Sequence, residues 1–229
     1  ASAPIASCRS TDQMRVTVPY SNLIFKIGVA LGGISVAPDG ATHQAMEEIS
    51  IVRSIPNMSM VVPCDFWEAY KATTAAARHN GPVYIRFGRE DVPVVTDKDT
   101  PFTLGKGEVF AAGSDLTLIA CGVMVYEALR ARETLAARGV SARVVNLHTP
   151  KPLDRALIER CARETGAIVT AEEHQVNGGL GGAVSEVVVQ SCPVPMELVA
   201  VHDRFGQSGK PAELMDAFGL RAKDIIAAA

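Results

Sequence analysis

Residues 23–62, LIFKIGVALGGISVAPDGATHQAMEEISIVRSIPNMSMVV, decide the fold. The first part, Leu23–Val29, is short, apolar and rich in β-branched and aromatic side chains, which predicts a buried strand. Residues 43–53 place apolar side chains at helical spacing, and Ile55-Pro56-Asn57 breaks that helix. Met58–Val62 then predicts a second strand. A strand, a helix and a second strand in this order predict a parallel sheet covered by helices.

The same alternation continues along the chain. Asp65 and Glu68 have the spacing of a capping box at the start of a helix, and Val83–Arg86 predicts a third strand. Further strands are expected at 116–121, 142–146, 167–171 and 195–201, and further helices at 123–138, 154–164, 178–190 and in two short C-terminal segments. The sequence therefore predicts an α/β fold.

The polar, proline-containing segment Asp97–Pro101 predicts a linker between two domains. We expect a first domain at 1–98 and a second at 104–229. The second shows a complete α/β pattern, whereas residues 1–22 begin in the middle of a pattern, as if a strand and a helix were missing upstream.

Composition narrows the class of protein. Of 229 residues, 48% are hydrophobic, which is enough for a large core and excludes a disordered chain. The net charge of −3 lacks the basic excess of a nucleic-acid-binding protein. We expect no signal peptide and no membrane span. The five cysteines are scattered and form no CxxC pair, so we expect neither a zinc site nor disulfides, and a cytoplasmic location.

The densest polar cluster is PDGATHQ at 38–44. It follows a predicted strand, and open parallel sheets bind ligands at the carboxyl ends of their strands. With a helix starting near Thr42, Asp39 and His43 would both point from its N-terminus into one crevice, where a histidine can move protons near neutral pH. The alternative is structural: a turn at Asp39-Gly40 with Thr42 as a helix cap.

Two arginines lie at the end of the third predicted strand. Arg86 and Arg89 flank Phe87-Gly88, and arginine suits bidentate binding of phosphate or carboxylate. Solvated or salt-bridged arginines beside Glu90 and Asp91 explain the same pattern equally well.

A second acidic cluster, Glu172-Glu173-His174, has the residue types of a metal site. Consecutive residues rarely converge on one ion, and no second ligand cluster is visible, so a structural role is the better interpretation. The GGLGG run at 178–182 lacks the spacing of a phosphate loop, and close packing of a helix on the sheet explains it better.

Several stretches together carry a family resemblance: GGISVAPDGATHQAMEEISIVRSIPNM (32–58), GPVYIRFGRE (81–90), ARVVNLHTPKPLD (142–154), GAIVTAEEHQVNGGLGGAVSEV (166–187) and HDRFGQSG (202–209). The chain resembles the transketolase family, specifically the separate C-terminal subunit of two-gene bacterial transketolases. The resemblance implies an incomplete thiamine-diphosphate pyrimidine-binding domain, a parallel sheet with helices on both faces, followed by a complete transketolase C-terminal α/β domain.

The resemblance also implies an activity, the transfer of a two-carbon ketol unit from a ketose phosphate to an aldose phosphate. It implies that Asp39 contacts a hydroxyl of the donor sugar, that His43 lies beside the reacting carbons, and that Arg89 binds substrate phosphate. Among the residues expected near the cofactor's aminopyrimidine, only Ile5 offers a contact, and a weak one. Leu31 departs from the family, which usually has a histidine there.

The cofactors implied are thiamine diphosphate and Mg²⁺, both held mainly by a partner. The family's activating glutamate and its GDG…N metal motif are not found in residues 1–229. We therefore expect an N-terminal subunit that carries the diphosphate and metal site, in a heterotetramer. Two alternatives remain. The first is a thiamine-diphosphate enzyme with a non-standard donor or acceptor, which the departure from the family at Leu31 suggests. The second is a non-catalytic partner subunit.

Overall fold

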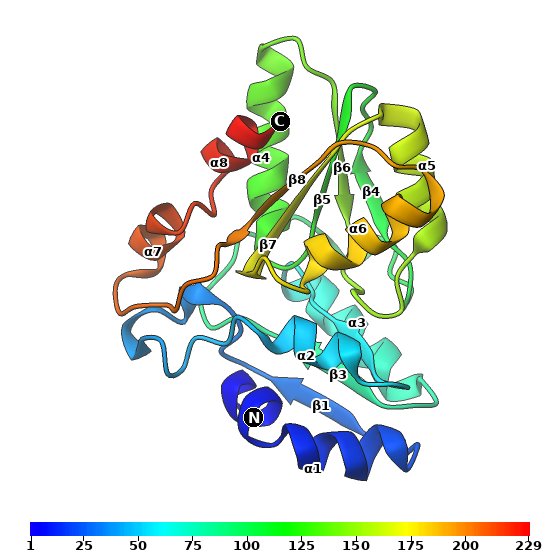
Figure 1. Cartoon of the computed structure of the whole chain (residues 1–229), viewed down its shortest axis with the longest axis vertical. Coiled ribbons are helices and arrows are strands. Elements are labelled where there is room, and N and C mark those ends of the chain that lie inside the picture. Colours follow the sequence, from blue (N-terminus) through cyan, green and yellow to red (C-terminus); the bar gives the residue numbers. More distant parts are fainter.

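The computed structural model describes residues 1–229. It contains two β-sheets, each packed against helices (Figure 1). The N-terminal sheet has three parallel strands in the order β1-β3-β2. Its strands are β1 (Lys26–Val29), β2 (Ser59–Val61) and β3 (Val83–Arg86). The helical segments of this half are η1 (Ile5–Arg9), α1 (Thr11–Arg15), η2 (Val16–Tyr20), η3 (Ile34–Asp39), α2 (Glu48–Ser54) and α3 (Phe66–Arg78).

The C-terminal sheet has five strands in the order β4-β6-β5-β7-β8, all parallel except β4, which runs antiparallel to β6. The strands are β4 (Glu108–Ala111), β5 (Leu116–Ala120), β6 (Ala142–Asn146), β7 (Ile168–Gln175) and β8 (Met196–Val201). The helices are α4 (Met124–Ala137), α5 (Arg155–Thr165), α6 (Leu180–Ser191), α7 (Pro211–Ala217) and α8 (Ala222–Ala228). Helices α5 and α6 lie on one side of the sheet and α4 and α8 on the other (Figure 1).

The predicted α/β class is confirmed, and the strand at Val83–Arg86 has the predicted bounds. The edge strand β4 was not predicted. It is short, and its pairing with β6 is a long-range contact that local sequence does not reveal. The helical segments within residues 5–20 were not predicted either. No helix of the structure combines the length and the apolar character needed to cross a bilayer.

The predicted helix over residues 43–53 starts later than expected, at Glu48. Before it, Ala45 forms a parallel bridge with Gly32, and the Gly33 amide donates to the Ala45 carbonyl at 2.7 Å. Residue 45 is therefore held in an extended conformation beside residue 32. The helix can begin only after this bridge. His43 lies in a turn, so the expectation of two side chains at one helix N-terminus was wrong.

The two halves share a hydrophobic core. One buried cluster joins Ile49 and Met60 of the N-terminal half to Leu147, Leu180 and Val184 of the C-terminal half. Backbone bonds also cross this boundary, among them Val62 N to His148 O at 2.8 Å. The carboxyl end of β2 is therefore held against the segment that follows β6.

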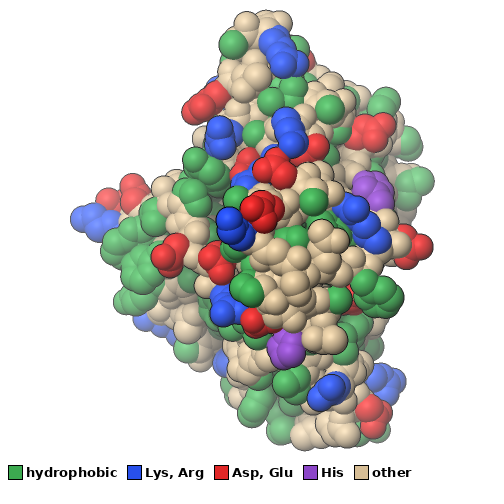
Figure 2. Space-filling model, turned by 90° about the vertical axis from the view of Figure 1, so that its left-hand side faces the viewer, with side chains coloured by type: hydrophobic (Ala, Val, Ile, Leu, Met, Phe, Trp, Pro, Cys, Tyr) green, Lys and Arg blue, Asp and Glu red, His purple; other side chains and the backbone are tan.

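Charges are mixed on the face that carries α7 and α8. Figure 2 views the molecule from this side and shows Lys and Arg side chains interspersed with Asp and Glu, without a continuous basic area.

Candidate active site

The segment between β1 and α2 carries Asp39 and His43. Helix η3 is interrupted at Ala37, whose φ of 64° is left-handed, and Gly40 follows with a φ of 76°. This positive φ is why the turn favours glycine at position 40, where a Cβ would lie 2.7 Å from Ser208 Oγ. The His43 amide then donates to the Gly40 carbonyl at 3.0 Å and closes the turn. Asp39 and His43 are both exposed.

Arg89 reaches this segment from the loop after β3. Its Nη1 donates to Asp39 Oδ2 at 2.7 Å and, at 3.4 Å, to the carbonyl of Val36. The side chains remain 41% exposed for Arg89 and 35% for Asp39. Because a guanidinium carries five N–H donors, Arg89 keeps donors free for an anion while Asp39 holds it in place. The structure thus brings two of the predicted site residues together.

His43 has a different environment from that pair. Its Nδ1 lies 3.0 Å from Thr42 Oγ1, and the structure gives it no hydrogen bond to Asp39 or Arg89. Asp39 therefore does not fix the tautomer of His43. Its exposed ring is available to a molecule that binds on this surface.

Leu31 lies just before η3, the helical segment that ends at Asp39. It is half-buried and has a φ of 69°, a left-handed conformation that is uncommon for a bulky side chain without glycine's freedom. The backbone around it is ordered, because Gly32 N donates to Phe87 O at 3.1 Å and Ala45 N to Leu31 O at 3.5 Å. At this position the loop presents an apolar side chain that can neither donate nor accept a hydrogen bond.

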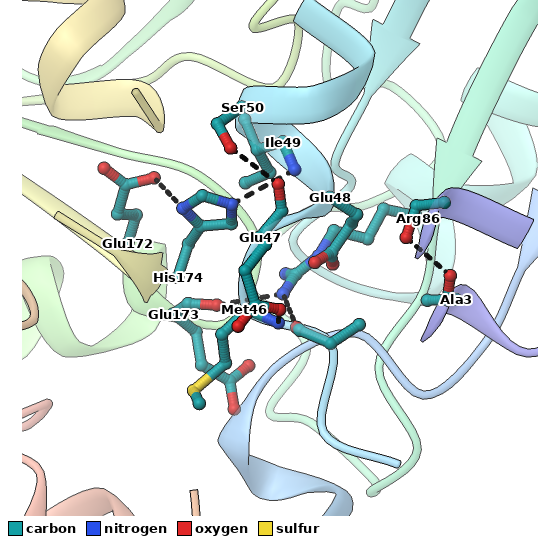
Figure 3. Close-up of polar contacts among 12 residues, drawn as sticks. Ala3, Met46, Glu47, Glu48, Ile49, Ser50, Arg86, Glu172, Glu173 and His174 are labelled. Carbon is teal, nitrogen blue, oxygen red and sulfur yellow. Dashed lines mark hydrogen bonds and ion pairs between the residues drawn. The ribbon is translucent and has the colours of Figure 1, made fainter. Parts of the chain in front are cut away.

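Arg86, the second candidate for anion binding, is committed elsewhere. Its guanidinium is buried and forms an ion pair with Glu48 (Figure 3). It also donates to the carbonyl oxygens of Ala45 and Glu173. Burial raises the pKa of the Glu48 carboxyl, and Arg86 opposes this shift. Arg86 therefore links the two halves and is not available to phosphate, whereas Arg89 is.

The Glu172-Glu173-His174 cluster has the structural role that the sequence favoured. Glu172 accepts from the amides of Leu180 and Gly181 at 2.6 and 2.8 Å and so caps α6. His174 Nε2 accepts from Ile49 N at 3.1 Å (Figure 3). Burial raises the pKa of both carboxyls and lowers that of His174. The three side chains serve different elements, and no group of three or more His, Cys, Asp or Glu residues is arranged to hold a metal.

The GGLGG run packs α6 onto the sheet, as predicted. A Cβ at Gly179 would overlap the Glu172 carboxylate, and one at Gly181 would lie 2.6 Å from Leu198 Cδ2. These glycines therefore allow close approach of helix and strand and do not form a phosphate loop.

The residues near the N-terminus fit only part of a thiamine cofactor. Ile5 in η1 is 49% exposed, so its aliphatic side chain can contact the face of a ring. Ser2 Oγ is buried without a hydrogen-bond partner. Residues 1–9 contain no aromatic side chain, and the structure offers no ligand set for a metal-bound diphosphate. The chain can thus supply a wall for the aminopyrimidine and does not fit the diphosphate half.

A cavity of about 430 Å³ lies between the halves, lined in part by Arg86, Glu173 and Gly122. Asp39, His43 and Arg89 are not among its lining residues. The exposed side chains of these three residues therefore lie outside this cavity.

Two family models match the chain: transketolase, pyrimidine binding domain, over residues 5–95, and transketolase, C-terminal domain, over 105–225. The chain belongs to the transketolase family. This confirms the resemblance drawn from the motifs, and with it the expected pair of pyrimidine-binding and C-terminal α/β folds.

Three relatives from the transketolase family are similar to nearly the whole of this chain. The 6-deoxy-6-sulfo-D-fructose transketolase subunit SqwH of Clostridium sp. (strain MSTE9) is 43% identical over 98% of this chain and 70% of its own length. A putative transketolase C-terminal section of Methanocaldococcus jannaschii is 39% identical over 96% of this chain and 70% of its own length. A subunit of the apulose-4-phosphate transketolase of Phocaeicola vulgatus is 37% identical over 95% of this chain and 70% of its own length.

A solved transketolase structure has the same fold. It is described as a split gene transketolase, inactive beta4 tetramer, and superimposes with a TM-score of 0.93 at 43% sequence identity, covering 99% of this chain and 72% of that one. The chain thus has the fold of split transketolase subunits of the C-terminal type.

One residue that shapes this site, Gln44, was not predicted from the sequence to do so. Its side chain is buried, and its Nε2 donates to the carbonyls of Ile34 and Ala37, both within the segment that carries Asp39. The sequence signal was the position of Gln44 at the end of the polar cluster PDGATHQ. An amide side chain there can hydrogen-bond the backbone carbonyls of its own loop.

Proposed function

We propose that the chain is the C-terminal subunit of a thiamine-diphosphate-dependent split transketolase. With an N-terminal partner it would transfer a two-carbon ketol unit between a ketose phosphate and an aldose phosphate. The observation that carries this proposal is the Asp39–Arg89 pair, which presents a carboxylate and a partly free guanidinium on one open surface.

Each site residue has a role suited to its chemistry. Arg89 binds the phosphate of the sugar, because its remaining N–H donors face solvent. Asp39 accepts a hydrogen bond from a hydroxyl of the donor. His43, exposed on the same turn, exchanges protons with oxygen atoms beside the reacting carbons.

Thiamine diphosphate and Mg²⁺ belong to the partner's part of the site, and Ile5 contributes at most one wall to the ring. When bound, the cofactor supplies the electron sink for cleavage of the carbon–carbon bond. The partner is an N-terminal transketolase subunit that holds the diphosphate and the metal. The relatives named as subunits support this assignment, as do the exposed side chains of Tyr20, Ile24 and Phe25, which offer an apolar surface to a second chain.

The expected assembly is a heterotetramer of two such pairs, in the cytoplasm, where the five free thiols would stay reduced. Within the chain we propose a division into domains at 1–98 and 104–229. The segment between them has no regular secondary structure until β4 begins at Glu108.

A second candidate function keeps the cofactor and changes the sugar. Leu31 offers no hydrogen bond where the family usually has a histidine, and two relatives are named for 6-deoxy-6-sulfo-D-fructose and apulose-4-phosphate. The same chemistry would then act on a donor or acceptor that is less polar at this contact.

The test is a donor screen. The protein is purified in complex with the N-terminal subunit of the same organism and assayed with thiamine diphosphate, Mg²⁺, a panel of ketose phosphates and a sulfonated ketose. Transfer that requires both subunits supports the proposal, and the preferred donor decides between the two candidates. Absence of transfer from every ketose in a complex that binds the cofactor would refute it and favour a non-catalytic subunit.

A further inference from the structure

The segment that carries Asp39 is built on the C-terminal half of the chain. The buried side chains of Ile34 and Ala37 belong to the same apolar cluster as Leu214 and Met215 of α7. Helix α7 packs directly against η3, and the two lie together at the left of Figure 1. The C-terminal half contains none of the proposed substrate-contacting residues, yet it supplies the support for the segment that does.

The first polar link is made by Glu173 at the end of β7. Its Oε1 accepts from the amide of Ser35, at 2.6 Å, inside η3. Gly33, with a φ of 96°, lies so close that a Cβ there would overlap the Glu173 carboxylate. Figure 3 shows this carboxylate pointing away from Glu172 and His174, as alternation along a strand requires. One buried carboxylate thus fixes the start of η3 from the other half.

The second link is made by Gln44. Its Nε2 donates at 2.8 Å to the carbonyl of Gln207, in the loop before α7, and at 3.2 and 3.3 Å to the carbonyls of Ile34 and Ala37. Gly206 approaches so closely that a Cβ there would overlap Gln44 Oε1. The HDRFGQSG stretch therefore packs on the inner side of the segment whose outer side carries Asp39.

These links act on a backbone that needs support. Ala37 has a φ of 64° and a ψ of −101°, a conformation that a residue with a Cβ keeps only when its surroundings impose it. Asp39 follows two residues later, and its carboxylate in turn holds Arg89. Loss of either link would release both residues together.

We propose that Glu173 and the Gly206–Ser208 loop are positioning elements for donor recognition. They hold the Ile34–Asp39 segment so that Asp39 and Arg89 face the sugar phosphate. This inference rests on the proposed function for the roles of Asp39 and Arg89, but the mechanical coupling it describes belongs to the chain alone.

The chain offers a matched pair of variants. Glu172 and Glu173 are adjacent, equally buried carboxylates, but Glu172 caps α6 within its own half. Glu173→Ala, Glu173→Gln and Glu172→Ala are compared in the complex with the N-terminal subunit, by hydrogen–deuterium exchange and by steady-state kinetics. Gly206→Ala, on the surface loop, tests the second link independently and serves if Glu173→Ala does not fold.

For Glu173→Ala we expect faster exchange at residues 33–44 and a KM for the donor raised about 10- to 100-fold, with a smaller change in kcat. Glu173→Gln keeps an acceptor for Ser35 N and restores both measurements. Glu172→Ala increases exchange at 179–184 and leaves the KM unchanged. Gly206→Ala repeats the exchange pattern of Glu173→Ala at 33–44.

Unchanged exchange at 33–44 in Glu173→Ala and Gly206→Ala would overturn the inference, as would equal effects of Glu172→Ala on that segment and on KM. The exchange measurement does not need a functioning enzyme. If the wild-type complex transfers no ketol unit, the proposed function fails while the coupling between the halves is still decided.

Discussion

Arg89 Nη1 and Asp39 Oδ2 lie 2.7 Å apart, although the two residues come from different loops of the N-terminal half. Arg89 follows β3, and Asp39 ends η3, the segment between β1 and α2. In the sheet, β1 and β3 are neighbours, so the loops that follow their carboxyl ends meet at one edge. The ion pair is exposed and contributes little to stability. Its consequence is orientation, because each partner limits where the other can point.

Replacement of Arg89 tests its assignment to the phosphate. Arg89→Ala should raise the KM for a ketose phosphate about 10- to 100-fold and change the KM for the unphosphorylated ketose much less, because only the phosphate loses its guanidinium. Steady-state kinetics of the complex on both sugars measure this difference. Arg138, exposed near the end of α4, provides the control variant Arg138→Ala. Equal losses on the two sugars would contradict the assignment.

The variant Leu31→His tests whether residue 31, where the family usually has a histidine, determines the choice of donor. Histidine tolerates the left-handed backbone better than leucine and adds a hydrogen-bond donor, so we expect unchanged or higher thermal stability. If Leu31 selects a non-standard donor, the variant should gain activity on common ketose phosphates and lose it on the preferred donor. A ratio of kcat/KM values that does not move would show that Leu31 takes no part in donor choice.

The buried ion pair between Arg86 and Glu48 should dominate the stability of the junction. Arg86→Leu leaves a buried carboxylate without its partner, and we expect the free energy of unfolding to fall by about 3–5 kcal/mol. The double variant with Glu48→Leu should lose less than Arg86→Leu alone. Urea denaturation of the three proteins measures this. Asp216→Ala, which breaks an exposed pair with Lys223, should leave stability nearly unchanged.

Much of the fold was accessible from the sequence, because alternating apolar segments identify the elements of an α/β protein. Val83–Arg86 matched in full, and α6 began two residues after its predicted start. The predicted start of α2 was wrong because a long-range bridge between Gly32 and Ala45 overrides local helical periodicity. Strand β4 escaped prediction for a similar reason, since its pairing partner lies in distant sequence.

The candidate site, like the fold, could be predicted only in part from the sequence. The motif PDGATHQ drew attention to Asp39 and His43, but the helix N-terminus predicted to carry both is a turn in the structure. Local spacing could not separate Arg86 from Arg89. Only the tertiary structure shows that Arg86 is buried against Glu48 while Arg89 stays accessible. The strand position of Arg86 was the available signal, because all four residues of β3 are buried.

His148 should make the fold sensitive to acid. Its imidazole is buried, stacks on Phe102 with ring centroids 4.3 Å apart, and has its pKa lowered by burial to about 4. In the unfolded chain it titrates near 6.5. Between these values only the unfolded state takes up the proton, so the stability present above pH 6.5 is lost as the pH falls toward 4.

From pH 7 to pH 5 this group should reduce the free energy of unfolding by about 2 kcal/mol. His148→Gln removes that part of the slope, and urea denaturation at both pH values measures the difference between variant and wild type. The raised pKa values of Glu48, Glu172 and Glu173 act in the opposite direction, but they are present in both proteins. Identical slopes in the two proteins would contradict the role of His148.

We infer that this chain forms a cofactor site only together with an N-terminal subunit. The decisive measurement is a calorimetric titration of thiamine diphosphate with Mg²⁺ into the protein alone, the N-terminal subunit alone and their stoichiometric mixture. We expect tight saturable binding in the mixture, and weak or no binding to this protein by itself. Tight binding to this protein alone, or no binding to the mixture beyond that of the separate subunits, would show that the cofactor site is not shared between the two subunits.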